Sequence, residues 1–178
     1  MKLIKVSWEN FKDYLLSDQT VEKYPNKSRE NLIAREILFK ELWKYPDFKN
    51  DWTPFFNGDY FSISHKKWLV VVWVSDSPIW VDVEYIKERN KFLLARNKDE
   101  EYEMLWWKNW KNFYILWTAK ESILKLHTKW LDFFGDIILL EVKDSELVFA
   151  FDKVKNIVVK YQIQENIIIS FAVFDKNS

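Results

Sequence analysis

The chain contains no cysteine among its 178 residues, so it has neither a disulfide framework nor thiol chemistry. It has no excess of either charge, because 27 Lys and Arg residues balance 27 Asp and Glu residues. That balance argues against a protein that coats nucleic acid nonspecifically. No run approaches the roughly 18 apolar residues of a membrane span, and the N-terminus has no apolar segment of signal-peptide length. We therefore expect a cytoplasmic protein that binds neither membrane nor nucleic acid.

Glycine is also scarce, with 2 residues where an average usage of about 7% predicts about a dozen. Turns favour glycine because the absence of a Cβ atom permits positive φ angles. The same sequence holds 11 tryptophans. The low count of glycine and the high count of tryptophan are both unusual for a chain of this length.

The spacing of apolar residues predicts both helices and strands. Helical spacing predicts amphipathic helices over 28–42, with Ser28 as the N-cap, and over 112–129. Short apolar runs between polar turns predict strands, the last four at 137–142, 147–151, 157–163 and 167–174. Two further strands, 69–74 and 79–84, flank the turn Ser75-Asp-Ser-Pro78, so we expect them to form a hairpin.

Strand 79–84 ends in two acidic residues, Asp82 and Glu84. Side chains two residues apart on a strand point to the same face, so the two carboxylates are expected to lie side by side. Such a pair suits a hard cation such as Mg²⁺, which takes oxygen ligands. A solvated strand end is the alternative explanation of the same pattern.

The second predicted helix carries Trp117, Glu121 and Lys125 at intervals of four residues, which places them in one stripe. Glu121 therefore offers a third carboxylate next to a cation. An ordinary ion pair between Glu121 and Lys125 explains the spacing equally well.

Three blocks occur in a set order: Phe61-Ser-Ile-Ser-His65, then Trp80-Val-Asp-Val-Glu84, then Trp117-Thr-Ala-Lys-Glu-Ser-Ile-Leu-Lys125. In order and separation they resemble the motifs of the 4′-phosphopantetheinyl transferase superfamily, and more closely its monomeric, two-subdomain, surfactin-type branch. The resemblance covers residues 50 to 132, about half of the chain. It implies an α+β monomer of two pseudo-symmetric subdomains, 1–86 and 87–178, each with a helix packed on an antiparallel sheet.

The resemblance also implies a reaction, in which the 4′-phosphopantetheine arm of coenzyme A passes to a serine of an apo acyl or peptidyl carrier protein. The enzyme would be a holo-[acyl-carrier-protein] synthase that depends on Mg²⁺ and releases 3′,5′-ADP. Its products would serve fatty-acid, polyketide or nonribosomal peptide synthesis. The nucleophile belongs to the carrier, so no catalytic Ser or Cys is expected in this chain.

Site residues follow from matching positions in the family motifs. The resemblance implies that the metal is held by Asp82, Glu84 and Glu121. Coenzyme A would be bound by basic and polar side chains, namely Lys27, Arg29, Ser64, His65, Lys120 and Lys125. Catalytic roles fall to Glu121 as the base for the serine, and to Lys125 and His65 as cations. Glu101 resembles a family acid that could assist, although an acid at a helix N-terminus needs no such role.

Tryptophan stands where the resembled family usually has glycine, at Trp52, Trp80 and Trp130. One hypothesis is that the gene comes from a lineage that reads UGA as glycine and was translated here with UGA as tryptophan. The other is that the chain is aromatic-rich and these tryptophans are genuine. Codons at the three positions distinguish the two.

Two other functions are alternatives to transfer. A catalytically silent family member could bind coenzyme A or a carrier protein, since the indole of Trp80 could crowd the metal site. An aromatic-rich carbohydrate-binding module would be all-β, which the helical spacing over 28–42 and 112–129 contradicts.

Overall fold

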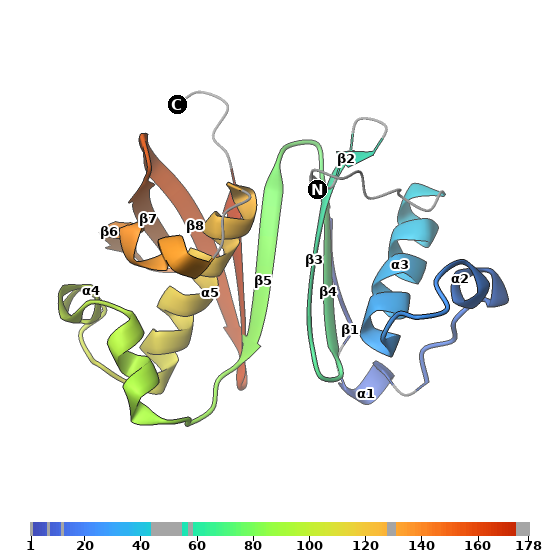
Figure 1. Ribbon diagram of the computed structural model, residues 1–178, viewed down its shortest axis with the longest axis horizontal. Helices are drawn as coiled ribbons and strands as arrows, with labels where there is room; N and C mark the ends of the chain where they lie inside the picture. The colour runs from blue at the N-terminus through green and yellow to red at the C-terminus, as the bar shows by residue number, and fades with distance from the viewer. Residues whose placement is uncertain are drawn as a thin grey trace. The chain divides into compact units, whose positions relative to one another are not determined.

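The structure is a computed structural model that describes residues 2–173 except for 7, 12, 44–54, 57–58 and 128–130. It contains helices and two antiparallel sheets, so the predicted α+β class is confirmed (Figure 1). The chain divides into two compact units, Met1–Ser77 and Pro78–Ser178. Each unit has one sheet and one long helix. In the part of the chain that the structure describes, no helix is long and apolar enough to cross a membrane.

Unit 1 is built around a sheet in the order β1-β4-β3-β2. Its strands are β1 (Lys2–Val6), β2 (Phe55–Phe56), β3 (Asp59–Lys66) and β4 (Leu69–Ser75). Its helices are α1 (Trp8–Phe11), α2 (Asp18–Lys23) and α3 (Arg29–Leu42). Ser28 caps α3 as predicted, because its side chain accepts a hydrogen bond from the backbone N–H of Asn31.

The core of unit 1 forms where α3 packs on β3 and β4. Val70 and Val72 point from β4 toward α3, and they meet Ile33 and Ile37 of the helix in one buried cluster. Opposed residues of antiparallel strands share a face. His65, which pairs with Val70, therefore also lies on the face that α3 covers.

Unit 2 has a five-stranded sheet in the order β5-β9-β8-β7-β6. Its strands are β5 (Ile79–Tyr85), β6 (Ile138–Lys143), β7 (Glu146–Phe151), β8 (Val154–Gln164) and β9 (Ile167–Val173). Its helices are η1 (Lys91–Arg96), α4 (Asp99–Met104), α5 (Trp110–Leu126) and η2 (Leu131–Asp136). The four strands predicted after residue 136 are thereby confirmed within a few residues at their ends.

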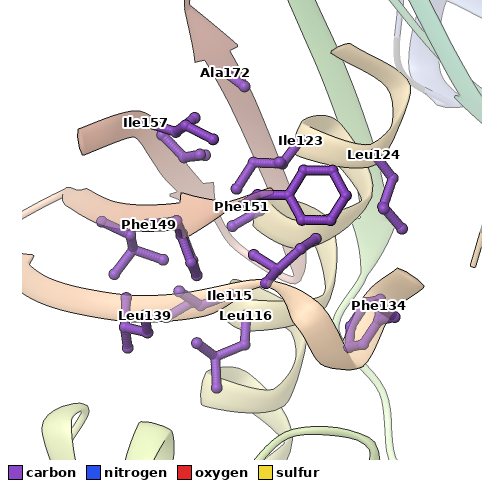
Figure 2. Close-up of a cluster of buried hydrophobic side chains, with 14 of the residues drawn as sticks. Ile115, Leu116, Ile123, Leu124, Phe134, Leu139, Phe149, Phe151, Ile157 and Ala172 are labelled. Carbon is purple, nitrogen blue, oxygen red and sulfur yellow. The ribbon is translucent and has the colours of Figure 1, made fainter. Parts of the chain in front are cut away.

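Helix α5 is the centre of unit 2. It packs on β5, β8 and β9, and its apolar side meets the inward residues of the sheet. Figure 2 shows Ile115, Leu116 and Ile123 of α5 facing Phe149 and other residues from the strands. The helix that carries the third motif block is thus fixed by its own hydrophobic stripe.

The predicted hairpin of strands 69–74 and 79–84 is wrong. Strand β4 pairs with β1 and β3, whereas β5 pairs along its whole length with β9. The turn after Ser75 therefore leads from the sheet of one unit to the sheet of the other. The two units separate at Ser77 and Pro78, earlier in the chain than the predicted boundary after residue 86.

Candidate active site

Asp82 and Glu84 lie on β5 and face α5. They pair across the strands with Ser170 and Ile168 of β9, and Ser170 contacts Thr118 of α5 through its hydroxyl at 2.6 Å. Because opposed residues share a face, both carboxylates point toward the helix. They are 1% and 5% exposed, so the alternative of a solvated strand end does not apply.

Lys125 joins the second and third motif blocks. Its ammonium group donates a hydrogen bond to Oδ1 of Asp82 at 2.5 Å, and it lies 3.5 Å from the carbonyl oxygen of Val81. The side chain of Lys125 is 37% exposed, whereas that of Asp82 is 2% exposed. A partly accessible cation is therefore held against a buried carboxylate.

Glu121 lies on α5 one turn before Lys125 and is half-buried. Helix α5 packs on β5 and runs antiparallel to it (Figure 1). Moving along α5 from Lys125 toward the N-terminus therefore follows the direction of β5 from Asp82 to Glu84. One helical turn rises about 5.4 Å and two strand residues about 6.6 Å. With Lys125 held at Asp82, this direction predicts that Glu121 lies toward the Glu84 end of β5.

The donor set fits Mg²⁺ in part. Two buried carboxylates on one strand face supply the hard oxygen ligands that this ion takes, and Mg²⁺ often uses only one or two carboxylates with waters and substrate phosphates. Among the residues that the structure describes, no group of three acidic or histidine side chains is arranged to hold a metal ion, and the set of Asp82, Glu84 and Glu121 stays a prediction. Cations are close instead, with Lys125 on Asp82 and Arg89 at 3.9 Å from Glu84.

Lys120, predicted to bind coenzyme A, is buried in a contact between two helices of unit 2. Its side chain is 1% exposed and its ammonium group lies 2.7 Å from Oε2 of Glu101, which is also buried. Burial lowers the pKa of Lys120, and the hydrogen bond to Glu101 opposes that shift. Oε2 of Glu101 also accepts the backbone N–H of Lys98 at the start of α4. The pair therefore ties α4 to α5, and the coenzyme A contact of Lys120 stays a prediction.

His65 and Ser64 point to opposite faces of β3, since they are neighbours on a strand. The ring of His65 lies on the α3 side, where its Nε2 is 3.1 Å from the side-chain amide nitrogen of Asn31. Ser64 is 5% exposed on the other face. The two residues are thus not placed for joint side-chain contact with one phosphate, and their roles stay predictions.

The two basic residues before and at the start of α3 differ in their surroundings. Arg29 donates hydrogen bonds to the backbone carbonyls of Tyr14 at 3.0 Å and of Phe11 at 3.4 Å, and its guanidinium lies over the ring of Phe11. Lys27 is exposed in the turn that precedes the helix. Arg29 therefore has partners within unit 1 and Lys27 lies in an exposed turn, and the coenzyme A contacts of both residues stay predictions.

Trp80 lies two residues before Asp82 and points to the same face of β5. It is 8% exposed and packs in the hydrophobic cluster around α5. Its indole therefore lies on the same strand face as Asp82 and Glu84, and crowding of the metal site by Trp80 stays a prediction. Trp52 and Trp130 lie outside the described residues.

Three partners in and around this site were not predicted from the sequence: Asn31 beside His65, Ser170 beside Thr118, and Asp82 as the acceptor for Lys125. Each joins residues far apart in the chain. For Lys125 the sequence did predict an ionic partner, but the helical spacing of four residues suggested Glu121 instead of Asp82.

Comparison with known proteins agrees with the motif blocks. The chain is 31% identical to the 4′-phosphopantetheinyl transferase gsp of Aneurinibacillus migulanus over 131 residues, which are 67% of this chain and 51% of that protein. No protein-family model matches the chain. The predicted resemblance is confirmed, and the chain belongs to the 4′-phosphopantetheinyl transferase superfamily. It spans about half the length of the curated relative that it matches.

Proposed function

We propose that this protein transfers the 4′-phosphopantetheine moiety of coenzyme A to a serine of an apo acyl or peptidyl carrier protein. The observation that supports it most is the contact between Lys125 and Asp82, because it joins two motif blocks that are 43 residues apart in the chain. A transferase of phosphorylated groups needs carboxylates for a metal and cations for phosphate oxygens in one place. The surfactin-type branch and a monomeric state are part of this proposal.

In the proposed reaction, the serine hydroxyl of the carrier attacks the β-phosphate of coenzyme A. A new bond forms between the serine oxygen and phosphorus, the bond from phosphorus to the leaving phosphate oxygen breaks, and 3′,5′-ADP departs. Glu121 takes the proton of the serine. Lys125 and His65 offset the negative charge that builds on the phosphate oxygens, and Lys27 is the accessible cation for a terminal phosphate of the nucleotide.

Asp82 and Glu84 would hold Mg²⁺, with Glu121 as the third predicted ligand. When bound, the ion would neutralise charge on the pyrophosphate of coenzyme A. Lys125 keeps its ammonium next to Asp82 and supplies positive charge at the same carboxylate.

Mass analysis of a carrier tests the proposal. Purified protein is incubated with coenzyme A, Mg²⁺ and an apo carrier, and the carrier is expected to gain the mass of one phosphopantetheine. We predict that Asp82→Ala abolishes this gain, because it removes a buried carboxylate ligand and leaves Lys125 without its partner. Glu88→Ala, which changes an exposed carboxylate shortly after β5, should leave transfer unchanged. Full transfer by Asp82→Ala would show that Asp82 is not a ligand of the metal.

The position of Trp80 favours one alternative, a silent member that binds coenzyme A or a carrier without transfer. Its large buried indole lies on the same strand face as Asp82. The test compares transfer by the chain with Trp80 and by its Trp80→Gly variant, with circular dichroism as a check that the variant is folded. Activity in the folded variant alone would favour the silent form.

A further inference from the structure

Among the described residues, seven other than glycine have a backbone in the left-handed region of positive φ. Four are acidic residues or asparagine, at 144, 152, 156 and 165. Short polar side chains such as those of Asp and Asn tolerate this region because they hydrogen-bond locally. The other three are Trp43, Trp68 and Trp106, with φ angles of 57°, 61° and 76°. A bulky residue is an outlier there, since its Cβ crowds the backbone.

All three tryptophans occupy positions that favour glycine. Trp43 follows the last residue of α3 and has φ 57° and ψ 14°. Trp106 comes shortly after α4, and its backbone N–H donates to the carbonyl oxygen of Glu103 at 3.0 Å. Helices commonly end on a left-handed residue, usually glycine. Trp68 is in the two-residue turn between β3 and β4.

Burial of the indole does not offset the backbone cost at positions 43 and 106, whereas Trp68 is 39% exposed and its ring lies 4.2 Å from the ammonium of Lys67. Trp43 is 82% exposed and Trp106 is 83% exposed. By contrast Trp117, where the family also has an aromatic residue, stacks on Phe113 with ring centroids 5.7 Å apart and lies 4.9 Å from Phe134. The described tryptophans therefore include some that pack with other rings, such as Trp117, and some that stand exposed on a left-handed backbone, such as Trp43 and Trp106.

We infer that the natural protein has glycine at positions 43, 68 and 106, encoded by UGA codons that its cell reads as glycine. The inference is independent of the proposed function. It extends the hypothesis for Trp52, Trp80 and Trp130, which rested on resemblance, to positions chosen by backbone geometry alone. At position 80 the backbone gives no such signal, because Trp80 is not among the residues of positive φ.

The inference also changes how the surface of unit 2 is interpreted. A surface hollow there is lined by residues that include Tyr102, Trp106, Trp107 and Lys108. With glycine at 106 the hollow loses an aromatic wall. We therefore assign no ligand to it.

The genomic codons and the mass of the native peptides test the inference directly. We expect UGA at 43, 68 and 106, glycine in the corresponding peptides of the source organism, and UGG at 117. A UGG codon or a tryptophan-containing native peptide at any of the three positions would overturn the assignment there.

A stability measurement tests the physical reason. The variant Trp43→Gly/Trp68→Gly/Trp106→Gly should unfold at a higher temperature than the chain as printed, because three residues leave a strained backbone. Trp107→Gly is the matched control, since Trp107 is 74% exposed and adjacent to Trp106 but is not among the residues of positive φ. The thermal midpoint of Trp107→Gly should stay the same as that of its parent or fall. The backbone argument would be refuted if the thermal midpoint of the triple variant did not rise. It would also be refuted if the midpoint of Trp107→Gly rose by as much as the triple variant's gain per substituted position.

Discussion

Two buried charged side chains among the described residues are held by specific partners. Glu36 on α3 accepts hydrogen bonds from Ser17 and Thr20, and Lys120 on α5 pairs with Glu101. An ion buried without a partner would cost several kcal/mol, so each partner is a requirement of the fold. Substitution of Glu36 or of Lys120 should therefore change the stability of the fold.

Removal of the Lys120 ammonium should strongly destabilise unit 2. Lys120→Met leaves the carboxylate of Glu101 buried without its cation, and we expect a loss of about 3–5 kcal/mol in the free energy of unfolding. Chemical denaturation measures it. Lys111→Met, on an exposed position of the same helix, should change stability by less than about 0.5 kcal/mol. The double variant Lys120→Met/Glu101→Gln should recover part of the loss, and a Lys120→Met protein as stable as its parent would contradict the buried pair.

Glu36 should make stability depend on acid pH. Burial alone would raise the pKa of Glu36, but hydrogen bonds from Thr20 and Ser17 outweigh burial and leave the pKa below its ordinary value. A lowered pKa in the folded state means that the unfolded state binds the proton more readily. The stabilisation is therefore present above the ordinary carboxyl pKa of about 4.3 and is lost as the pH falls through the lowered value.

The measurement is denaturation of Glu36→Gln and its parent at pH 7 and at decreasing pH. We expect the variant to be about 1–3 kcal/mol less stable at pH 7 and the difference to shrink in acid. Glu22→Gln, an exposed carboxylate on α2, serves as the control. A difference that stays constant down to strongly acid pH would argue against the hydrogen-bonded carboxylate as its cause.

At the scale of helices and strands, the packing of α5 on β9 includes a buried polar contact. The hydroxyls of Thr118 and Ser170 meet at 2.6 Å in the buried contact between the two. Thr118→Val keeps the shape of the side chain but leaves the hydroxyl of Ser170 without this partner. We predict a loss of about 1–3 kcal/mol in the free energy of unfolding, because a buried polar group becomes unsatisfied.

Two further variants isolate the hydroxyl pair in the same denaturation experiment. Thr118→Ser should retain most of the stability. Thr118→Val/Ser170→Ala should be more stable than Thr118→Val alone, since both polar groups are then gone. Equal losses in Thr118→Val and Thr118→Ser would point to packing of the methyl group instead.

Local patterns in the sequence identified the elements but not their partners. Helix α3 was predicted from its N-cap and apolar spacing, and the last four strands from apolar runs between polar turns. The pairing of β5 with β9 was not predicted, because the turn after β4 suggested a hairpin. The sequence of a strand does not identify which distant strand it pairs with. The candidate site shows the same limit: spacing set Asp82 and Glu84 on one face, whereas the contact of Lys125 with Asp82 depends on the packing of α5.

For the whole molecule, the proposed ligand contacts are divided between the two units. His65 and Lys27 belong to Met1–Ser77, and Asp82, Glu84 and Glu121 belong to Pro78–Ser178. Sequence motifs alone assign these residues to one reaction. Linkage between ligand binding and unfolding can test whether they act on the same ligand, because any ligand that binds only the folded state raises its stability by RT ln(1 + [L]/Kd).

We predict that coenzyme A with Mg²⁺ raises the thermal midpoint of the protein. At a ligand concentration of about 100 times Kd the gain is about 2.7 kcal/mol, or roughly 5–11 °C for a chain of this size. Removal of the metal with a chelator should reduce the shift, because the carboxylates would then repel the pyrophosphate. Asp82→Asn should lose the part of the shift that depends on Mg²⁺, and His65→Ala should show a smaller shift with and without the metal. Glu88→Gln should behave as its parent. If His65→Ala kept the full shift while Asp82→Asn lost it, coenzyme A would be bound without the histidine, and the nucleotide contacts proposed for β3 would have to be abandoned.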